Sequence, residues 1–376
     1  HLAEELERQG FMVSHIILQD GPHGGPVCDD HTLAFLQNKL PQCNGYLAVG
    51  AGVVNDLTKW LSCERGSFYA VCATAATMNG YTAANVAATL DGVKSLVVSH
   101  APLAVFADPA IIAGAPHELT AAGLGDVLAK PISTADWLMN HHLLDEYFCP
   151  FCARMINDLE PTYMEHPAQI KEHAGPAIKG LFDALLYSGI AMTMVGTSAP
   201  ASGGEHMLSH TLDMMAMVDG APHDLHGRQV GVTVIFTAAL YERLFAMDQF
   251  KIRLLPAAID RGFWGRLADP VERQYREKLP LLERMAGHIR MRTPAWTAFL
   301  QSSREQVRPP ATIKHCLKTA GAAHTWSDLG CSRERFLAAA RHMHEIRKRP
   351  TIVDLAWLLG ILPDAAESIT DQWLTT

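Results

Sequence analysis

The chain has no excess of positive charge and little cysteine for its length. Its 31 lysine and arginine residues are outnumbered by 39 acidic residues, which gives the 376-residue chain a formal net charge of −8. A protein of that sign has no electrostatic reason to bind nucleic acid or an anionic membrane. The eight cysteines are scattered, unlike the dense spacing of a small secreted scaffold, and this indicates a reducing cytoplasm.

Long hydrophobic runs are also missing. We find no apolar run of the ~18 residues that a transmembrane helix requires, and no signal peptide is visible. The chain begins inside a predicted helix, HLAEELERQG, so we expect a preceding segment, with the first strand of the fold, to be missing. At this length, two domains are expected rather than one.

Helix and strand patterns alternate over the first part of the chain. Helical stretches at 31–40 and 55–63 separate strand-like runs at 11–20, 45–52, 68–74, 95–100 and 104–108. This alternation predicts an α/β domain over residues 1–114, built on a parallel sheet that helices cover on both faces. Helical periodicity dominates the rest, which predicts an all-α domain over residues 115–376.

A glycine turn follows one of these strands. In YLAVGAGVVNDLTK, Gly50 and Gly52 come directly after an apolar strand, and Asp56 lies on the helix that follows. Glycines let the chain turn tightly and let backbone N–H groups approach a phosphate, which a helix N-terminus attracts. The third glycine of the G-x-G-x-x-G fingerprint is missing. These residues alone leave open a phosphate site or a plain strand-to-helix turn.

Two histidines four residues apart follow another glycine pair. In ASGGEHMLSHTLDM, His206 and His210 would share one face of a helix. His226, followed by a glycine, and Asp126, preceded by GLG, could complete a site. Asp126 and His206 are both expected to open helical stretches and to converge from different helices. One Asp with two His leaves a coordination position open, as in catalytic metal sites, although chance pairs are common among 19 histidines.

Five motifs in a fixed order connect these residues: GAGVVNDLTK, TAATMNGYTA, LTAAGLGDVLAK with STADW, PASGGEHMLSH and HGRQVGV. Over about residues 45–245 the chain resembles the glycerol-1-phosphate dehydrogenases of the bacterial type. These belong to the superfamily of metal-dependent alcohol dehydrogenases, glycerol dehydrogenases and dehydroquinate synthases. The resemblance implies a Rossmann-like dinucleotide-binding domain followed by an all-α metal- and substrate-binding domain.

The resemblance also implies an activity. It is the interconversion of dihydroxyacetone phosphate and sn-glycerol 1-phosphate with NAD or NADP, a reaction of phospholipid metabolism. The enzyme would be a cytoplasmic homodimer that uses one divalent metal, zinc or in some members nickel or iron. The metal would act as a Lewis acid on the substrate oxygen, and the nicotinamide would carry the hydride.

Roles for single residues follow from the same resemblance. The metal would be held by Asp126, His206 and His226. The dinucleotide would be contacted by Gly50, Gly52, Asp56, Thr74, Thr77 and Lys94. His210 could relay a proton from the substrate oxygen or be a packing histidine. Lys130, four residues after Asp126, could attract an anionic substrate or be a solvated lysine.

Two residues depart from the family pattern. Asn79, in TMNGY, stands where the family usually has an Asp that contacts substrate hydroxyls, and Ala199, in TSAPASGG, where it commonly has an Arg. Asn keeps the hydrogen bonding but not the charge, and without the Arg a fork for phosphate is lost. The alternatives are a dehydrogenase of glycerol, another polyol or another alcohol, a dehydroquinate-synthase-like cyclase, or a catalytically inactive binding homologue. The cyclase requires basic residues, in which the stretches around the ligands are poor.

Overall fold

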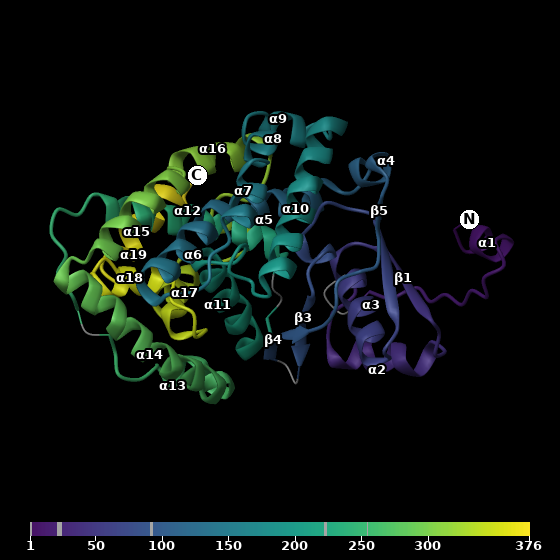
Figure 1. The fold of residues 1–376 in the computed structure, drawn as a ribbon, viewed down its shortest axis with the longest axis horizontal. Helices are drawn as coiled ribbons and strands as arrows, with labels where there is room; N and C mark the ends of the chain where they lie inside the picture. Colours follow the sequence, from purple (N-terminus) through teal and green to yellow (C-terminus); the bar gives the residue numbers. More distant parts are fainter. Residues whose placement is uncertain (1, 21–24, 91–92, 222–223, 254) are drawn as a thin grey trace. The chain divides into compact units, whose positions relative to one another are not determined.

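The computed structural model describes the whole chain except residues 1, 21–24, 91–92, 222–223 and 254, and it leaves out the side chains of residues 93 and 94. The chain forms two compact units (Figure 1). Unit 1 comprises His1–Thr74 and Gly80–Asp108, and unit 2 comprises Ala75–Asn79 and Pro109–Thr376. The short segment Ala75–Asn79 therefore belongs to unit 2, although the chain on either side of it belongs to unit 1.

Unit 1 is an α/β unit. Its elements are α1 (Leu2–Arg8), α2 (Asp30–Lys39), β1 (Gly45–Gly50), α3 (Gly52–Glu64), β2 (Phe68–Ala73), β3 (Asn85–Leu90), β4 (Val93–Val98) and β5 (Val105–Ala107), and η1 (Asn79–Tyr81) spans its boundary. The sheet has the order β1-β2-β5, and both pairs of neighbours are parallel. The helix α3 connects β1 to β2, as parallel neighbours require. The predicted α/β class is confirmed.

The strand predictions for unit 1 are partly wrong. Residues 11–20, predicted as a strand, have no regular secondary structure. The side chains of Phe11 and Met12 are exposed there, whereas Ile16 and Leu18 pack against the buried cluster that contains Trp60. The segment therefore contacts the core without forming a strand. The strand β3 was not predicted, because its Asn-Val-Ala-Ala-Thr-Leu sequence has few strongly β-forming residues. It pairs antiparallel with β4, which therefore does not join the parallel sheet.

The helix α3 covers one face of the parallel sheet. Trp60 of α3 lies in a buried cluster against which Tyr46 of β1 packs. Side chains alternate along a strand, so the next residues of each strand point to the opposite face. There Val49, Phe68 and Phe106 are 53%, 53% and 55% exposed. In the described part of unit 1 the expectation of two covered faces is therefore not met.

Unit 2 is built of helices, which confirms the predicted all-α class. They are α4 (Pro109–Ala113), α5 (His117–Leu128), α6 (Lys130–Leu144), α7 (Pro150–Asn157), α8 (Glu160–Met164), α9 (Pro167–Lys171), α10 (Gly175–Val195), α11 (Gly204–Asp219), α12 (His226–Phe245), α13 (Arg261–Trp264), η2 (Gly265–Leu267), α14 (Ala268–Met291), α15 (Pro294–Gln306), α16 (Pro310–Thr319), η3 (Ser327–Leu329), α17 (Arg333–His342), η4 (Met343–Glu345), α18 (Ile352–Leu358) and α19 (Ala366–Trp373). The largely buried α12 packs against α5, α11, α16 and α18.

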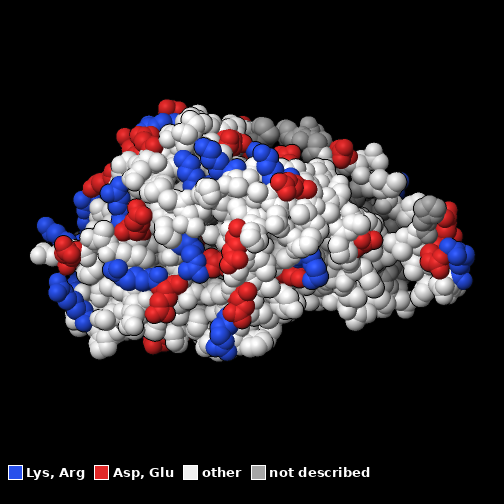
Figure 2. Space-filling model, turned by 90° about the horizontal axis from the view of Figure 1, so that it is seen from above, with Lys and Arg blue, Asp and Glu red and all other residues white. Residues whose placement is uncertain are grey.

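One helix among those described, α10, is long and apolar enough to cross a membrane by length and composition. Half of its apolar window is buried inside the protein, and its Lys179 and Asp183 form an ion pair at 2.5 Å. These are features of a helix packed in a protein interior with one solvated edge. Basic and acidic side chains are intermixed on the face shown in Figure 2, in keeping with the modest net charge.

Candidate metal centre

The three predicted ligands converge in unit 2. Asp126 lies in the last turn of α5, His206 in the first turn of α11, and His226 is the first residue of α12. Asp126 thus ends a helix, contrary to the expectation that it opens one. One ligand atom from each residue lies within 4.8 Å of the other two, and Nε2 of His206 is 3.9 Å from Oδ1 of Asp126. Ligand atoms of a tetrahedral ion with ~2.1 Å bonds are roughly 3.4 Å apart, so a small closure would let them share one ion.

Glycines bring α5 and α12 into backbone contact at this point. A Cβ atom on Gly125 would lie 2.0 Å from the carbonyl oxygen of Gly227, and one on Gly227 would lie 2.0 Å from the carbonyl oxygen of Ala122. No side chain fits at such distances, so both positions require glycine. The contact places Asp126, next to Gly125, close to His226, next to Gly227.

Asp126 is buried and held as a carboxylate. Its Oδ1 accepts a hydrogen bond from Nζ of Lys130 at 2.8 Å, and its Oδ2 accepts one from the backbone N–H of Asn79 at 3.1 Å. Burial acts to raise the pKa of Asp126, but Lys130 and the two histidines outweigh it, and the pKa lies below its ordinary value. The anionic oxygen that a divalent ion requires is therefore present at neutral pH.

His206 is held as a neutral imidazole. Its Nδ1 lies 2.7 Å from Oε1 of Glu205. The carboxylate accepts the Nδ1 hydrogen and leaves the lone pair on Nε2, the atom that faces Asp126. Burial lowers the pKa of His206 well below its ordinary value. The ring is therefore in the tautomer and charge state of a metal ligand.

Further hydrogen bonds fix the carboxyl groups behind His206. Oε1 of Glu205 accepts hydrogen bonds from the backbone of Gly203 at 2.7 Å and from the Ser133 hydroxyl at 2.8 Å. Oδ2 of Asp136 accepts one from the backbone of Gly204 at 2.7 Å. Burial and then Glu205 raise the pKa of Asp136 to about 7, and burial also raises the pKa of Glu205. The first turn of α11 is thus anchored to α6 by buried carboxyl groups.

His226 also belongs to a second cluster. Its ring stacks on that of His210 with centroids 5.5 Å apart, and His210, Asp213 and His226 also offer ligand atoms within 4.8 Å of one another. The Arg347 guanidinium donates a hydrogen bond to Nε2 of His210 at 2.7 Å. A positive charge lies beside each cluster, Arg347 at His210 and Lys130 at Asp126. In the cluster that contains Asp126, however, the carboxyl group is held ionised and the tautomer of His206 is fixed by Glu205, which makes it the better candidate metal site.

The remaining predicted residues of this site lie as follows. Lys130 is buried and bonded to Asp126, so the interpretation as a solvated lysine is wrong. The backbone of Asn79 contacts the centre, but its side-chain Nδ2 lies 3.5 Å from Sδ of Met192. Ala199 is buried in an apolar cluster, where it provides no group that could hold a phosphate.

In unit 1 the glycine turn opens α3. Gly50 ends β1 and Gly52 begins α3, and no side chain caps the N-terminus of that helix. The Asp56 carboxylate points inward: it pairs with Nζ of Lys59 at 3.3 Å and accepts a hydrogen bond from the backbone of Ala87 at 3.3 Å. Asp56 therefore links α3 to β3 within the unit.

The other predicted cofactor residues are more scattered. Thr74 follows β2, and its backbone N–H donates to the carbonyl oxygen of Gly50 at 3.2 Å, which brings it to the glycine turn. Thr77 belongs to unit 2 with the segment Ala75–Asn79. Lys94 lies in β4, and its side chain is outside the described part of the chain. The dinucleotide contacts of these residues remain predictions.

Sequence reasoning missed several residues around the centre. Glu205 directly precedes the ligand His206. Metal-binding histidines often donate a hydrogen bond to a carboxylate, so this acidic neighbour could have been predicted to orient His206. Asp136 lies in STADW, one of the five motifs, but no role was predicted for it. Arg347 lies 137 positions from His210, and no local pattern indicates that the two meet.

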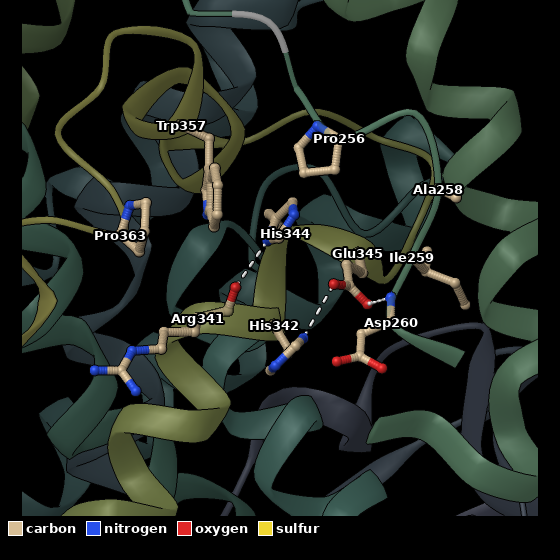
Figure 3. A pocket seen from close by; sticks show the side chains of 10 residues that line it. All are labelled: Pro256, Ala258, Ile259, Asp260, Arg341, His342, His344, Glu345, Trp357 and Pro363. Carbon is tan, nitrogen blue, oxygen red and sulfur yellow. Dashed lines mark hydrogen bonds and ion pairs between the residues drawn. The ribbon is translucent and has the colours of Figure 1, made fainter. Parts of the chain in front are cut away.

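A cavity of about 440 Å³ in unit 2 is separate from this cluster (Figure 3). None of its lining residues is a predicted ligand. They are Pro256, Ala258, Ile259, Asp260, Arg341, His342, His344, Glu345, Trp357 and Pro363. Glu345 accepts hydrogen bonds from the backbone of Asp260 at 3.2 Å and from Nδ1 of His342 at 3.0 Å. The cavity wall therefore includes the well-anchored η4 segment, which leads into Arg347.

Comparison with known proteins defines the class of the protein. The family model for iron-containing alcohol dehydrogenase matches residues 2–116. The glycerol dehydrogenase of Schizosaccharomyces pombe has a similar structure, with a TM-score of 0.59 at 14% identity over 98% of this chain and 80% of that one. The NAD⁺ complex of sulfoacetaldehyde reductase from Bifidobacterium kashiwanohense has a TM-score of 0.59 at 16% identity, over 99% and 87%. The fold is that of the iron-containing alcohol dehydrogenases.

Sequence relatives narrow the class to one family. The glycerol-1-phosphate dehydrogenase [NAD(P)+] of Geobacillus stearothermophilus is 32% identical over 347 residues, which is 92% of this chain and 80% of the relative. That of Bacillus velezensis is 29% identical over 351 residues, 93% and 79%. The chain belongs to the glycerol-1-phosphate dehydrogenase family. The resemblance inferred from its motifs is confirmed.

Proposed function

We propose that this protein interconverts dihydroxyacetone phosphate and sn-glycerol 1-phosphate with NAD(H) or NADP(H) and a divalent metal. The observation that carries the proposal is the convergence of anionic Asp126 with His206 and His226, in a chain of this family. An ion held by these residues supplies Lewis-acid polarisation of the substrate oxygen, and the nicotinamide supplies or accepts the hydride.

The protein's own groups hold the protons of the site. A guanidinium can only donate, so the Nε2 of His210 that faces Arg347 carries the lone pair. The ring hydrogen of His210 therefore lies on Nδ1, and we propose that this N–H donates a hydrogen bond to the substrate oxygen. Lys130 keeps Asp126 ionised, and Glu205 keeps the hydrogen of His206 on Nδ1.

The function is tested by loading the purified protein with Zn²⁺, adding NADH or NADPH with dihydroxyacetone phosphate, and following the absorbance of the reduced cofactor. We expect oxidation of the cofactor and a loss of at least about 100-fold in His226→Ala, because several kcal/mol of charge stabilisation go with the ion. His166→Ala, at an exposed histidine just before α9 whose side chain makes no capping hydrogen bond, is the control and should keep full activity.

Other outcomes would indicate the alternatives. Activity only with dihydroxyacetone, glycerol or other unphosphorylated compounds would assign a polyol or alcohol dehydrogenase. Release of inorganic phosphate without net oxidation of the cofactor would indicate a cyclase. No turnover of any substrate by metal-loaded protein would favour an inactive binding homologue.

We also propose zinc as the metal and a cytoplasmic homodimer as the working form. One carboxylate oxygen and two imidazole nitrogens suit Zn²⁺ in an open tetrahedral site, with nickel or iron as the alternatives that elemental analysis of the purified protein would reveal. All eight cysteines are free thiols, which suits a reducing compartment. Light scattering during size-exclusion chromatography tests the dimer.

A further inference from the structure

Two arginines lie beside the candidate metal centre. Nη1 of Arg347 donates to the Ser202 hydroxyl at 2.8 Å, and its Nη2 donates to Nε2 of His210 at 2.7 Å. Arg349 donates to the backbone carbonyl of Ser202. The two guanidinium groups therefore meet at Ser202, just before the helix whose first turn carries His206.

Arg347 makes no direct ion pair among the described residues. Its hydrogen-bond partners are a hydroxyl and an imidazole, and the residue is partly buried. Burial and then Arg349 lower the pKa of Arg347 to about 10, while the Glu205 carboxyl acts in the opposite direction, so Arg347 remains charged at neutral pH. An anionic ligand at this point would offset the repulsion between the two arginines.

The backbone at Arg347 is strained. Its φ of 56° lies in the left-handed region, which costs free energy for any residue with a Cβ and persists only where the surroundings impose it. Glycine would avoid this cost. Arg292 has a similar φ of 48° at the end of α14, so the conformation alone assigns no role, and the case for Arg347 rests on its contacts.

Buried groups hold the segment that precedes the arginine. Nζ of Lys278 donates to the carbonyl oxygens of His344 at 2.5 Å and Ile346 at 2.9 Å, and it pairs with the buried Asp354 at 2.8 Å. Glu345, between the two carbonyls, is fixed from the side of the cavity (Figure 3). This clamp imposes the backbone conformation and aims the guanidinium toward the metal centre.

We propose that Arg347 binds the phosphate group of the substrate and so selects phosphorylated three-carbon compounds over free polyols, an inference that rests on the proposed function. A guanidinium matches two phosphate oxygens with parallel N–H donors. The His210 ring that it contacts stacks on His226, so the guanidinium lies one imidazole away from a metal ligand. A substrate with its oxygen at the metal would extend its phosphate to Arg347.

The test uses Arg347→Gly, which removes the guanidinium and relieves the backbone strain, so that folding is preserved. Zn²⁺-loaded protein is assayed with dihydroxyacetone phosphate and with dihydroxyacetone. Calorimetry measures binding of dihydroxyacetone phosphate in the presence of NAD⁺, an oxidised pair that cannot react. We expect KM and the dissociation constant for the phosphorylated ketone to rise roughly 10- to 100-fold, as for loss of a hydrogen bond to a charged group. The kcat/KM for dihydroxyacetone should fall far less, by what the loss of the hydrogen bond from Arg347 to His210 costs alone.

Two further variants keep the test decisive. Lys348→Ala removes a neighbouring positive charge that is 73% exposed and should change neither constant. Arg347→Asn replaces Arg347→Gly if the glycine chain does not fold, since asparagine also tolerates the left-handed region.

The outcomes separate this inference from the proposed function. Equal losses with both ketones would mean that Arg347 only positions His210. The inference would also be overturned if KM and the dissociation constant for the phosphorylated ketone did not change in Arg347→Gly. No binding of the phosphorylated ketone by the unaltered protein would overturn it as well. Binding that depends on Arg347 without any turnover would refute the proposed function and leave the phosphate site standing. If the protein turned over dihydroxyacetone phosphate and Arg347→Gly did not alter that turnover, the proposed function would stand and the phosphate site at Arg347 would be refuted.

Discussion

At the scale of single residues, the hydrogen bond between His206 and Glu205 decides which ring nitrogen is available to an ion. A carboxylate that accepts the Nδ1 hydrogen fixes the tautomer, orients the ring and makes Nε2 more basic. Because Oε1 of Glu205 also accepts hydrogen bonds from Gly203 and Ser133, the carboxylate cannot rotate away. The ligand is therefore prepared before any ion binds.

We expect Glu205→Gln to weaken metal affinity by about 10- to 100-fold, as changes to such supporting groups typically do. The amide oxygen preserves the hydrogen-bond acceptor but not the charge. The metal-free protein should not become less stable, because burial already disfavours the Glu205 carboxylate and raises its pKa. Competition with a chromogenic chelator measures the affinity, and Glu118→Gln, at a residue that is 61% exposed, is the control. Equal affinities in the two variants would show that Glu205 does not support the ligand.

The sequence was most informative about residues whose chemistry is local. Asp126, His206 and His226 were identifiable because residue type, flanking glycines and motif order all pointed to them. Arg347 was not, because its approach to His210 depends on the clamp around Lys278 and on a backbone conformation that the sequence does not reveal. The role of Lys130 was also ambiguous, because only the fold shows that it is buried against Asp126.

At the scale of elements, the site depends on how closely α5 and α12 approach. In Gly125→Ala the new Cβ would meet the carbonyl oxygen of Gly227, so the helices must separate. We expect a loss of about 3 kcal/mol or more of unfolding free energy, with loss of the bound metal. Gly287→Ala, in α14 with no atom within 4 Å of the new Cβ, should instead stabilise the protein by roughly 0.5–1 kcal/mol. Chemical denaturation of both variants tests the contrast, and equal effects would contradict it.

Elements with a strong period were predictable, and elements defined by their partners were not. The helices α2 and α3 lie within a few residues of their predicted ranges, because amphipathic periodicity arises within each helix. A strand exists only where another strand pairs with it. Among the described residues the apolar run at 11–20 pairs with no strand, whereas β3 pairs with β4. The strand order β1-β2-β5 could likewise not be predicted, because local sequence patterns do not show which strands become neighbours.

At the scale of the whole molecule, the two units offer different ligand chemistry. The uncapped N-terminus of α3 in unit 1 suits the pyrophosphate of a dinucleotide, and the cluster in unit 2 suits a divalent ion. A ligand that binds only the folded chain stabilises it by mass action, about 2.7 kcal/mol at a hundredfold excess over its dissociation constant. Each ligand should therefore raise the melting temperature independently.

The final prediction separates the two sites with one variant in each unit. Gly52→Asp puts an acid in the first turn of α3, where it favours the helix but repels pyrophosphate. We expect it to abolish the rise in melting temperature with NADH and to keep the rise of several degrees with Zn²⁺, whereas His226→Ala should do the opposite. Thermal unfolding scans with each ligand alone measure both shifts. If either variant abolished both shifts, the division into a dinucleotide-binding domain over residues 1–114 and a metal-binding domain over residues 115–376 would be wrong.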